Sequence, residues 1–471
     1  MKKAALINAF GKYSKIFLTL LVNAILSRIL SADDYGVVAV ITVFSTLFTT
    51  LSDMGFGAAI VQKKDLNKSD IDNIYSFTVY ISVFLMLIFI LCSFPISSFF
   101  ENDVYIGLGV ILSVSLLFNS LNMVPNGILS RDKKFWTISI RTIVVYFIAS
   151  LFTIFLALLG FSYYALALES VFTAFFTFIW NYFSLDLRFS IFFDFKSIKK
   201  VLNYSGFQFA FNIVNYLSRN LDNLLTGRFM GSAQLGYYNK AYTLMLFPVN
   251  NLSGVITPVL HSILSDFQHN YLIIYKQYLR VVKLLLCLGA FIAPFCYLGA
   301  SEIIDILYGQ NWEQTISCFQ ILSFAIISQM LNTSSGGVFQ AIGNTRLLFI
   351  NGIVNTIVTV IAIIIGVFYG KTILNLSICI AIAYIIHSFL TFFILIKLGF
   401  RFKLSKFFFD ILPDIFVLVV MIIAVVIYPL HIANILLSIL LKGIFLLIIF
   451  ANALFFTGEF RIFIQLFRKE K

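Results

Sequence analysis

Long apolar runs alternate with short polar connections along the whole chain. Each run has about the length of a helix that crosses a bilayer, roughly 20 apolar residues. The first six runs are Lys15–Leu30, Val37–Ile60, Asn73–Phe94, Val104–Leu129, Ile138–Leu159 and Tyr163–Phe183. Six more follow a basic connection, at Val201–Leu225, Gly236–Leu260, Gln277–Gly299, Thr315–Phe339, Leu347–Tyr369 and Thr372–Ile396. The last two are Ile411–Tyr428 and Ile435–Phe456. The pattern predicts an all-α, polytopic membrane protein with fourteen spans.

Composition strengthens this prediction. Of the 471 residues, 60% are hydrophobic and only 11% are charged, whereas soluble domains are about 45–50% apolar and about 25% charged. So much apolar surface cannot be hidden in a water-soluble core, and the connections leave no room for a large soluble domain. The start of the chain mimics a signal peptide, but the run Ile16–Leu30 lacks a clear cleavage site. We therefore expect a retained first span.

The basic residues lie mainly in the connections on one side of the predicted membrane. The formal net charge is +12. Twenty-four Lys and Arg residues lie in the connections on the N-terminal side, and only Arg228 and Lys371 lie on the opposite side. By the positive-inside rule, both termini are then cytoplasmic. The opposite side carries the acids Asp33, Asp34, Glu101, Asp103, Glu302 and Asp305. The positive charge is thus explained by orientation and contact with anionic lipid, and no nucleic-acid partner is expected.

Two segments 200 residues apart resemble each other. Arg28–Gly36 aligns with Arg228–Gly236 without a gap, and each final glycine opens a new span. The two copies begin six spans apart, so they have the same orientation and form a parallel repeat. The prediction is a first lobe over residues 1–186, a second lobe over residues 187–400, and two appended spans with a C-terminal tail over residues 401–471.

Each predicted lobe begins with a helix that is polar along one face. Steps of three or four residues connect the polar positions, as on a single helical face. We call these positions the polar stripes. In span 7 the stripe is Gln208, Asn212, Asn215, Arg219 and Asn223, and in span 1 it is Asn8, Lys12, Lys15, Thr19 and Asn23. These side chains either hydrogen-bond to neighbouring helices or line a water-filled central cavity, and the matched stripes favour the cavity.

Ionisable residues within the spans are costly and usually face the protein interior or water. The basic ones are Lys15, Arg28, Arg141, Arg219, Lys240, Lys283 and Lys442, and the acidic ones are Asp53, Glu169 and Asp222. This basic excess favours an anionic passenger such as a pyrophosphate, which arginine grips with two hydrogen bonds.

Simpler interpretations remain for several of these groups. Residues near span ends can extend the charged group to the membrane surface, and this applies to Arg28, Lys240, Lys283 and Lys442. Arg219 and Asp222 are three residues apart and can neutralise each other. Arg141 and Glu169 can pair across spans 5 and 6. Asp53 either caps a break in its helix or accepts a cation.

Sequence signatures of catalysis are not found. There is no P-loop or dinucleotide-binding glycine motif. The four histidines are scattered without metal-ligand spacing. A membrane glycosyltransferase or polymerase would carry a larger extramembrane loop with clustered carboxylates. We therefore expect no enzyme activity, no cofactor and no bound metal.

Several segments together resemble the polysaccharide-exporter (Wzx-like) branch of the multidrug/oligosaccharidyl-lipid/polysaccharide (MOP) superfamily, and the resemblance covers nearly the whole chain. They are Leu26–Gly36, Ser52–Gln62, Arg219–Asp222, Gly236–Tyr242 and Pro258–Ser262. The resemblance implies two six-helix lobes around a central cavity that opens alternately to each side. It also implies an oligosaccharide on undecaprenyl pyrophosphate as passenger, flipped across the bacterial cytoplasmic membrane for surface polysaccharide biosynthesis.

The resemblance further implies ion coupling, with Asp53, Asp222 and Glu169 as candidate residues. The expected partners are the lipid-linked oligosaccharide, the lipid bilayer, and a glycan polymerase with its export machinery. The substrate cavity is expected to contain Lys12, Lys15, Thr19, Asn23, Arg28, Arg141, Gln208, Asn212, Asn215, Arg219, Asn223 and Lys240. Two alternatives share the fold, a MATE-like drug or metabolite antiporter and a lipid II-type flippase, which the two appended spans resemble.

Overall fold

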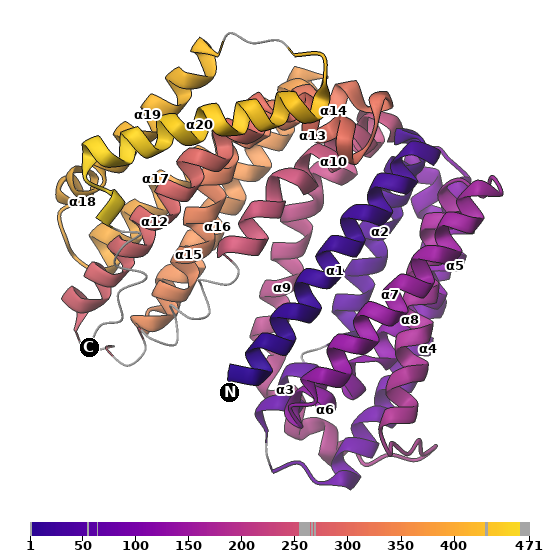
Figure 1. The fold of residues 1–471 in the computed structure, drawn as a ribbon. Coiled ribbons are helices and arrows are strands. Elements are labelled where there is room, and N and C mark those ends of the chain that lie inside the picture. The colour runs from indigo at the N-terminus through magenta and orange to yellow at the C-terminus, as the bar shows by residue number, and fades with distance from the viewer. Residues whose placement is uncertain are drawn as a thin grey trace. The chain divides into compact units, whose positions relative to one another are not determined.

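A computed structural model describes most of the chain (Figure 1). It covers residues 2–53, 56–63, 65–253, 264, 267, 270–428 and 432–461. Side chains are not described at 2–10, 58, 200–212, 214, 215, 253 and 345. Every regular element in this part of the chain is a helix. The helices form two compact units, Met1–Gly236 (unit 1) and Tyr237–Lys471 (unit 2). The predicted division into lobes at residue 186 stays a prediction.

The helices of unit 1 follow the first seven predicted spans. They are α1 (Lys2–Ile29), α2 (Ala32–Asp53), α3 (Phe56–Gln62), α4 (Lys68–Phe100), α5 (Val104–Leu121), α6 (Met123–Arg131), α7 (Phe135–Leu158), α8 (Tyr163–Ser184) and α9 (Phe195–Phe229). Helix α10 (Ser232–Pro248) begins in unit 1 and leads into unit 2. Spans 2 and 4 are each built from two helices in sequence.

The helices of unit 2 follow the later predicted spans. They are η1 (Val249–Ser253), α12 (Tyr271–Leu298), α13 (Ala300–Leu307), η2 (Gln310–Trp312), α14 (Glu313–Ser323), α15 (Ala325–Ala341), α16 (Thr345–Ile364), η3 (Ile365–Gly370), α17 (Ile373–Phe392), η4 (Phe393–Gly399), α18 (Leu404–Asp410), α19 (Leu412–Ile427) and α20 (Ile435–Thr457). The pairs α14–α15 and α18–α19 are each bent by 53°. The motif segment Pro258–Ser262 lies outside the described residues.

The described part contains nine helices long and apolar enough to cross a membrane, or eleven if each bent pair forms one span. Three further helices coincide with predicted spans, namely α1, α9 and α10. These three carry the polar stripes and the motif residues around Gly236, which lower their mean hydropathy. Each of the fourteen predicted spans therefore coincides with a helix or with two or three consecutive helices. The protein is a multi-pass helical membrane protein, as predicted.

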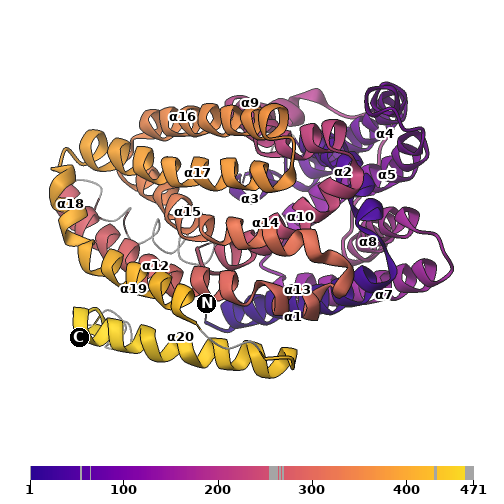
Figure 2. The same ribbon diagram turned by 90° about the horizontal axis from the view of Figure 1, so that it is seen from above.

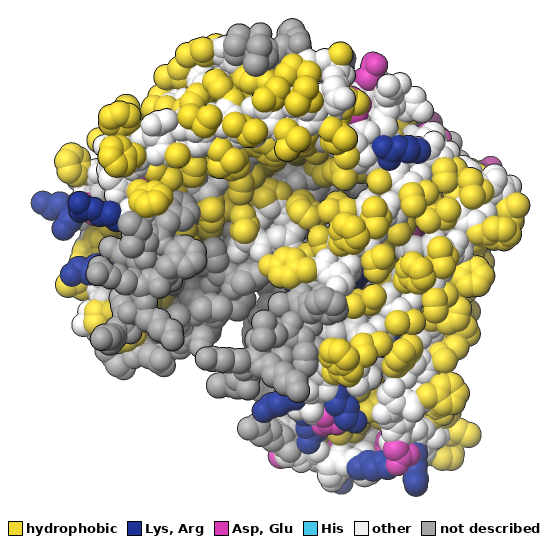
Figure 3. Space-filling model, in the orientation of Figure 1, with side chains coloured by type: hydrophobic (Ala, Val, Ile, Leu, Met, Phe, Trp, Pro, Cys, Tyr) yellow, Lys and Arg dark blue, Asp and Glu magenta, His cyan; other side chains and the backbone are white. Residues whose placement is uncertain are grey.

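In unit 1, α1 packs on α7, α4 on α5, and α5 on α8, while α9 packs on α2 and α4. The connections meet at two opposite ends. At one end, Ser162 after α7 donates a hydrogen bond to Asp34 at the start of α2. There, too, Arg228 is 2.6 Å from Glu101. At the other end, Lys68 pairs with Asp186. In unit 1, alternate connections therefore lie at the same end, as the distribution of basic residues among the connections predicts. The charged side chains gather where α3 and α6 lie (Figure 3).

Unit 2 is built around α12. This helix packs on α15 and α14 and on both appended helices, α19 and α20. Figure 2 shows α20 along one edge of unit 2 beside α19. An apolar cluster forms much of the contact of α12 with α19 and α20, including Ala290, Val417, Met421 and Leu446. Hydrophobic side chains also cover the face of α20 seen in Figure 3. The outer surface of the appended pair is therefore suited to lipid.

The two glycines of the sequence repeat meet at one crossing in unit 1. A Cβ on Gly36 would lie 1.7 Å from the carbonyl oxygen of Ser232, and one on Gly236 would lie 1.9 Å from that of Ala32. Each glycine therefore packs on the backbone of the other repeat, at positions that are again 200 residues apart. This reciprocal contact supports the sequence repeat, because only residues without a side chain allow so close an approach.

Candidate functional site

The polar stripe of α1 is partly exposed and partly in contact with α7. Lys12 and Lys15 are exposed. The Nζ of Lys15 lies 5.8 Å from the ring centre of Tyr146 on α7. The Tyr146 side chain also lies beside Thr19 of the stripe and Glu169 of α8. The structure thus brings together Lys15, Thr19 and Glu169, three predicted site residues from two helices, around one tyrosine.

Other positions of α1 bond along the helix itself. The Oγ1 of Thr19 donates to the carbonyl of Lys15 at 2.9 Å, and the amide of Asn23 donates to the carbonyl of Thr19 at 3.0 Å. The guanidinium of Arg28 donates to the carbonyl of Ala24 at 2.5 Å and is exposed. Bonds of this kind satisfy polar side chains within a helix without a partner helix. Part of the hydrogen-bonding capacity of the stripe is therefore satisfied along α1 itself.

Arg141 on α7 is buried in a network of amides. Its Nη1 donates to Asn126 Oδ1 at 2.9 Å and also to Asn181 on α8. The amide nitrogen of Asn181 in turn donates to Asn122 at 2.8 Å. The pairing of Arg141 with Glu169 that the sequence allowed is not the arrangement found. Because its partners are neutral amides, the positive charge of Arg141 is not cancelled.

The polar stripe of span 7 is only partly described. The side chains of Gln208, Asn212 and Asn215 lie outside the described part, as does that of Asn8 in span 1. Arg219 is exposed on α9, whereas Asp222 is 3% exposed. The Oδ1 of Asp222 accepts a hydrogen bond from the backbone N–H of the half-buried Asn223 at 2.8 Å. Arg219 and Asp222 therefore occupy different environments although they lie one turn apart.

Lys240 on α10 is held by aromatic rings. Its Nζ lies 4.6 Å from the ring centre of Tyr308 and 5.5 Å from that of Trp312, and the residue is 6% exposed. Both rings attract the cation through their electron-rich faces. The position of Lys240 near a span end had suggested that its side chain can extend to the membrane surface, but the side chain is buried instead. The ammonium group therefore lies inside unit 2 against these two rings.

Asp53 is the last residue of α2, and α3 begins at Phe56. The carboxylate of Asp53 hydrogen-bonds with the backbone of Gly57 in the first turn of α3. A carboxylate in this position satisfies a free N–H and complements the positive end of the helix. The structure therefore favours a capping role for Asp53 over a cation site.

Two further basic residues form ion pairs that sequence reasoning missed. Lys442 on α20 lies 2.5 Å from Glu302 on α13, and Lys283 on α12 lies 2.7 Å from Glu459. The sequence allowed both lysines to extend to the membrane surface, and each is instead paired with a carboxylate. It follows that they do not add free positive charge.

A second polar network in unit 2 was also missed. On α16, Asn351, Asn355 and Thr359 lie on one face. The Oγ1 of Thr391 on α17 donates to Asn351 at 3.0 Å, and Thr359 and His387 hydrogen-bond at 3.2 Å. These three polar residues are four positions apart in the sequence, and that spacing would have predicted a polar helical face. This face places amide and hydroxyl groups between α16 and α17.

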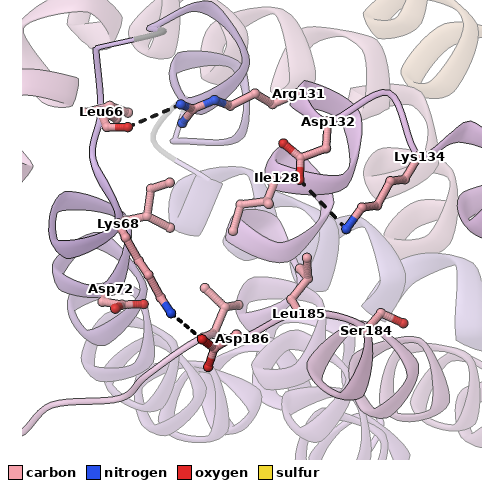
Figure 4. A pocket seen from close by; sticks show the side chains of 12 residues that line it. Leu66, Lys68, Asp72, Ile128, Arg131, Asp132, Lys134, Ser184, Leu185 and Asp186 are labelled. Atoms are coloured by element: carbon pink, nitrogen blue, oxygen red, sulfur yellow. Dashed lines mark hydrogen bonds and ion pairs between the residues drawn. The ribbon is translucent and has the colours of Figure 1, made fainter.

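A pocket of about 370 Å³ lies at the charged end of unit 1 (Figure 4). Its lining comes from three predicted cytoplasmic connections and includes Lys68, Arg131, Lys134 and Asp186. Arg131 donates to the carbonyl of Leu66 at 3.2 Å. The ammonium of Lys68 hydrogen-bonds to Asp186 and holds the pKa of that carboxyl below its ordinary value. The pocket is thus an ion-paired junction of connections at this end of unit 1.

The long apolar helices, together with sparse polar groups and buried basic side chains, define a polytopic membrane protein of transporter type. The chain belongs to the polysaccharide biosynthesis protein family, which it matches over residues 25–317. It is therefore a membrane protein of polysaccharide biosynthesis, as the resemblance of its motifs predicted.

Named relatives are bacterial. The chain is 24% identical over 314 residues to the teichuronic acid biosynthesis protein TuaB of Bacillus subtilis strain 168, a match to 65% of this chain and 64% of TuaB. The chain thus spans just under two thirds of the length of TuaB. It is 23% identical over 412 residues to the lipopolysaccharide biosynthesis protein WzxC of Escherichia coli strain K12, covering 81% of this chain and 78% of WzxC.

Solved structures of transporters share the fold. The lipid II flippase MurJ, in an inward closed conformation, matches with a TM-score of 0.72 at 15% identity, over 97% of this chain and 99% of MurJ. An inward-facing MATE-family multidrug resistance transporter of the MOP superfamily matches with a TM-score of 0.64 at 18% identity, over 82% of this chain and 94% of that chain. The chain has the fold of this superfamily.

Proposed function

We propose that the protein flips a lipid-linked oligosaccharide across the bacterial cytoplasmic membrane, with an undecaprenyl-pyrophosphate carrier and alternating access. The observation that carries the proposal is family membership together with retained positive charge inside an apolar helical protein. Arg141 is buried and donates to the neutral amides of Asn126 and Asn181. These partners do not cancel its charge, which therefore favours an anionic passenger.

The exposed basic positions support the same passenger chemistry. Lys12, Lys15 and Arg28 on α1 and Arg219 on α9 are exposed. A pyrophosphate carries charge that arginine binds with two parallel hydrogen bonds, while sugar hydroxyls suit amide and hydroxyl side chains such as Asn23. The lipid tail would stay in the bilayer, which the apolar outer helices already contact. The central cavity and its lining residues are part of the proposal.

We further propose that both termini are cytoplasmic and that the chain has no enzyme activity of its own. The convergence of basic connections at one end of unit 1 supports the orientation. A glycan polymerase and export machinery would use the flipped unit at the outer face. Coupling to an ion through Asp222 or Glu169 belongs to the same proposal, whereas the capping contact of Asp53 makes it the weaker candidate.

A deletion strain tests the function. Loss of the gene should cause lipid-linked repeat units to accumulate at the cytoplasmic face and surface polysaccharide to disappear, and the wild-type gene should restore both. Arg219→Ala should fail to restore export at normal membrane abundance, whereas Arg280→Ala, which removes an exposed arginine of α12, should restore it. Export by Arg219→Ala at the wild-type level would remove Arg219 from the site. Unchanged export in the deletion strain would contradict the function itself.

A further inference from the structure

A buried charge cluster in unit 2 joins α12 to the two appended helices. Lys283 on α12 is 2.7 Å from Glu459, the second residue after α20, and 3.5 Å from Asp414 in the first turn of α19. The thiol of Cys287, one turn further along α12, donates to Asp414 Oδ1 at 3.2 Å. Neither the family nor the proposed passenger accounts for this cluster.

The cluster is enclosed. The side chain of Asp414 is 0% exposed, that of Glu459 is 11% exposed and that of Lys283 is 19% exposed. Among the described residues, the Oδ2 of Asp414 has no hydrogen-bond partner. Next to the cluster begins the apolar contact of α12 with α19 and α20, which includes Cys287 and Val417. Water therefore cannot solvate the Asp414 carboxylate as it would at a surface.

The charges in this cluster do not balance. One ammonium faces two carboxylates, which leaves a net charge of −1 if all three groups are ionised. A buried charge without a partner is very costly, and such a group takes up a proton instead. Two carboxylates that share one site cannot both ionise readily. One carboxyl group of the pair should therefore be neutral.

We propose that this cluster is a proton-binding site and that the proton is carried by Asp414. Glu459 has the shorter contact with Lys283 and is the less buried of the two acids, so it is the ionised partner. Asp414 has the longer contact, and its Oδ2, 3.5 Å from the Lys283 ammonium, makes no hydrogen bond among the described residues. Binding takes one proton from the aqueous phase and converts the Asp414 carboxylate to a neutral carboxylic acid. Release at higher pH restores the carboxylate.

A metal cation fits the site less well than a proton. Cations such as Ca²⁺ and Mg²⁺ need several oxygen ligands, whereas Asp414 faces an ammonium group and a thiol. The described residues hold no group of three or more side chains placed to hold a metal ion. Further titratable groups lie nearby on the same elements, including Lys276 and Arg280 on α12, Lys406 on α18 and Arg461 after Glu459. Asp410 on α18 accepts a hydrogen bond from the hydroxyl of Tyr275 on α12 at 3.4 Å. They form a separate contact.

Protonation would govern how the appended helices pack on α12. With the proton bound, the cluster is neutral and α12, α19 and α20 contact each other around one ion pair. With the proton released, an unpaired charge lies at the end of the apolar contact and weakens it. This site goes beyond the proposed function, because it holds whether or not the protein carries a lipid-linked sugar.

Infrared difference spectroscopy of the full chain in lipid nanodiscs tests the proposal. The wild type should show the carbonyl band of a protonated carboxylic acid, and Asp414→Asn should lose it. Glu459→Gln should lose it as well, because Asp414 then pairs alone with Lys283 and ionises. A purely structural cluster would give no such loss in Glu459→Gln. Asp410→Asn is the matched control and should keep the band.

Three results would overturn the proposal. The first is a wild-type spectrum equal to that of Asp414→Asn at every pH at which both proteins are folded. The second is a band that persists unchanged in Glu459→Gln. The third is loss of the wild-type band on addition of sodium chloride at constant pH, which would show a sodium site. Because Glu459→Gln keeps Asp414 in place, it decides the question even if Asp414→Asn does not fold.

Discussion

Replacing Gly36 by alanine would push apart the crossing of α2 and α10. The added Cβ would lie 1.7 Å from the carbonyl oxygen of Ser232, roughly 1.3 Å inside the 3.0 Å limit that real Cβ atoms keep. Because the atom it meets belongs to the backbone, no rotamer change relieves the overlap, and the helices must separate. Overpacking of this kind costs about 1–3 kcal/mol. Alanine regains up to about 1 kcal/mol of helix propensity, so we expect a net loss of about 1–2 kcal/mol.

Thermal unfolding of purified protein in detergent measures this loss. Gly336→Ala on α15 is the matched control, because no heavy atom lies within 4 Å of its added Cβ. The control should unfold at the wild-type temperature or slightly above, and Gly36→Ala clearly below. The double variant with Gly236→Ala should cost less than the two single changes together, since one separation relieves both overlaps. Equal unfolding temperatures for Gly36→Ala and Gly336→Ala would refute the close crossing.

Three further substitutions test buried and exposed charges. Arg141→Met should lower the unfolding temperature by leaving buried amides unsatisfied, at about 1–3 kcal/mol for each orphaned group, and a wild-type melting curve would contradict the network. Lys442→Met should cost about 3–5 kcal/mol by leaving Glu302 unpaired, and adding Glu302→Gln should recover part of the loss. The hydrogen bond from Arg228 holds the pKa of the Glu101 carboxyl below its ordinary value. The pair therefore stabilises the fold above the ordinary pKa of a glutamate, and this stabilisation is lost as the pH falls through the lowered pKa. Unfolding curves of Glu101→Gln should lack this acid step, and high salt should reduce it in the wild type.

The membrane spans, and the end at which each connection of unit 1 lies, could be predicted because the sequence signals for them are local. A run of apolar residues is visible in any window of the sequence, and the positive-inside rule needs only the order of the connections. The repeat was inferred from the matched positions of Gly36 and Gly236, and the structure places each of these glycines against the backbone of the other segment. Each of these predictions depends on residues that are close in sequence or that are matched at the offset of the repeat.

The ion pairs could not be predicted, because each joins residues far apart in the chain. Lys283 and Glu459 are 176 residues apart, and Lys442 and Glu302 are 140 residues apart. Both glutamates lie at span ends, where sequence reasoning treats acids as solvated. A pairing of Arg141 with Glu169 stayed open in the sequence for a related reason. Charge alone suggested that partner, whereas packing of α7 on α6 and α8 offers amides instead.

Transport of a lipid-linked sugar is tested most directly with the full chain reconstituted into liposomes. The liposomes contain a fluorescent undecaprenyl-pyrophosphate oligosaccharide in the inner leaflet. An enzyme or quencher added outside then reports each sugar that reaches the outer leaflet. We predict protein-dependent exposure of the sugar, faster than in empty liposomes and faster than with Arg219→Ala at equal protein content. Exposure at the rate of empty liposomes, with folded protein and a passenger of the correct repeat unit, would contradict the account.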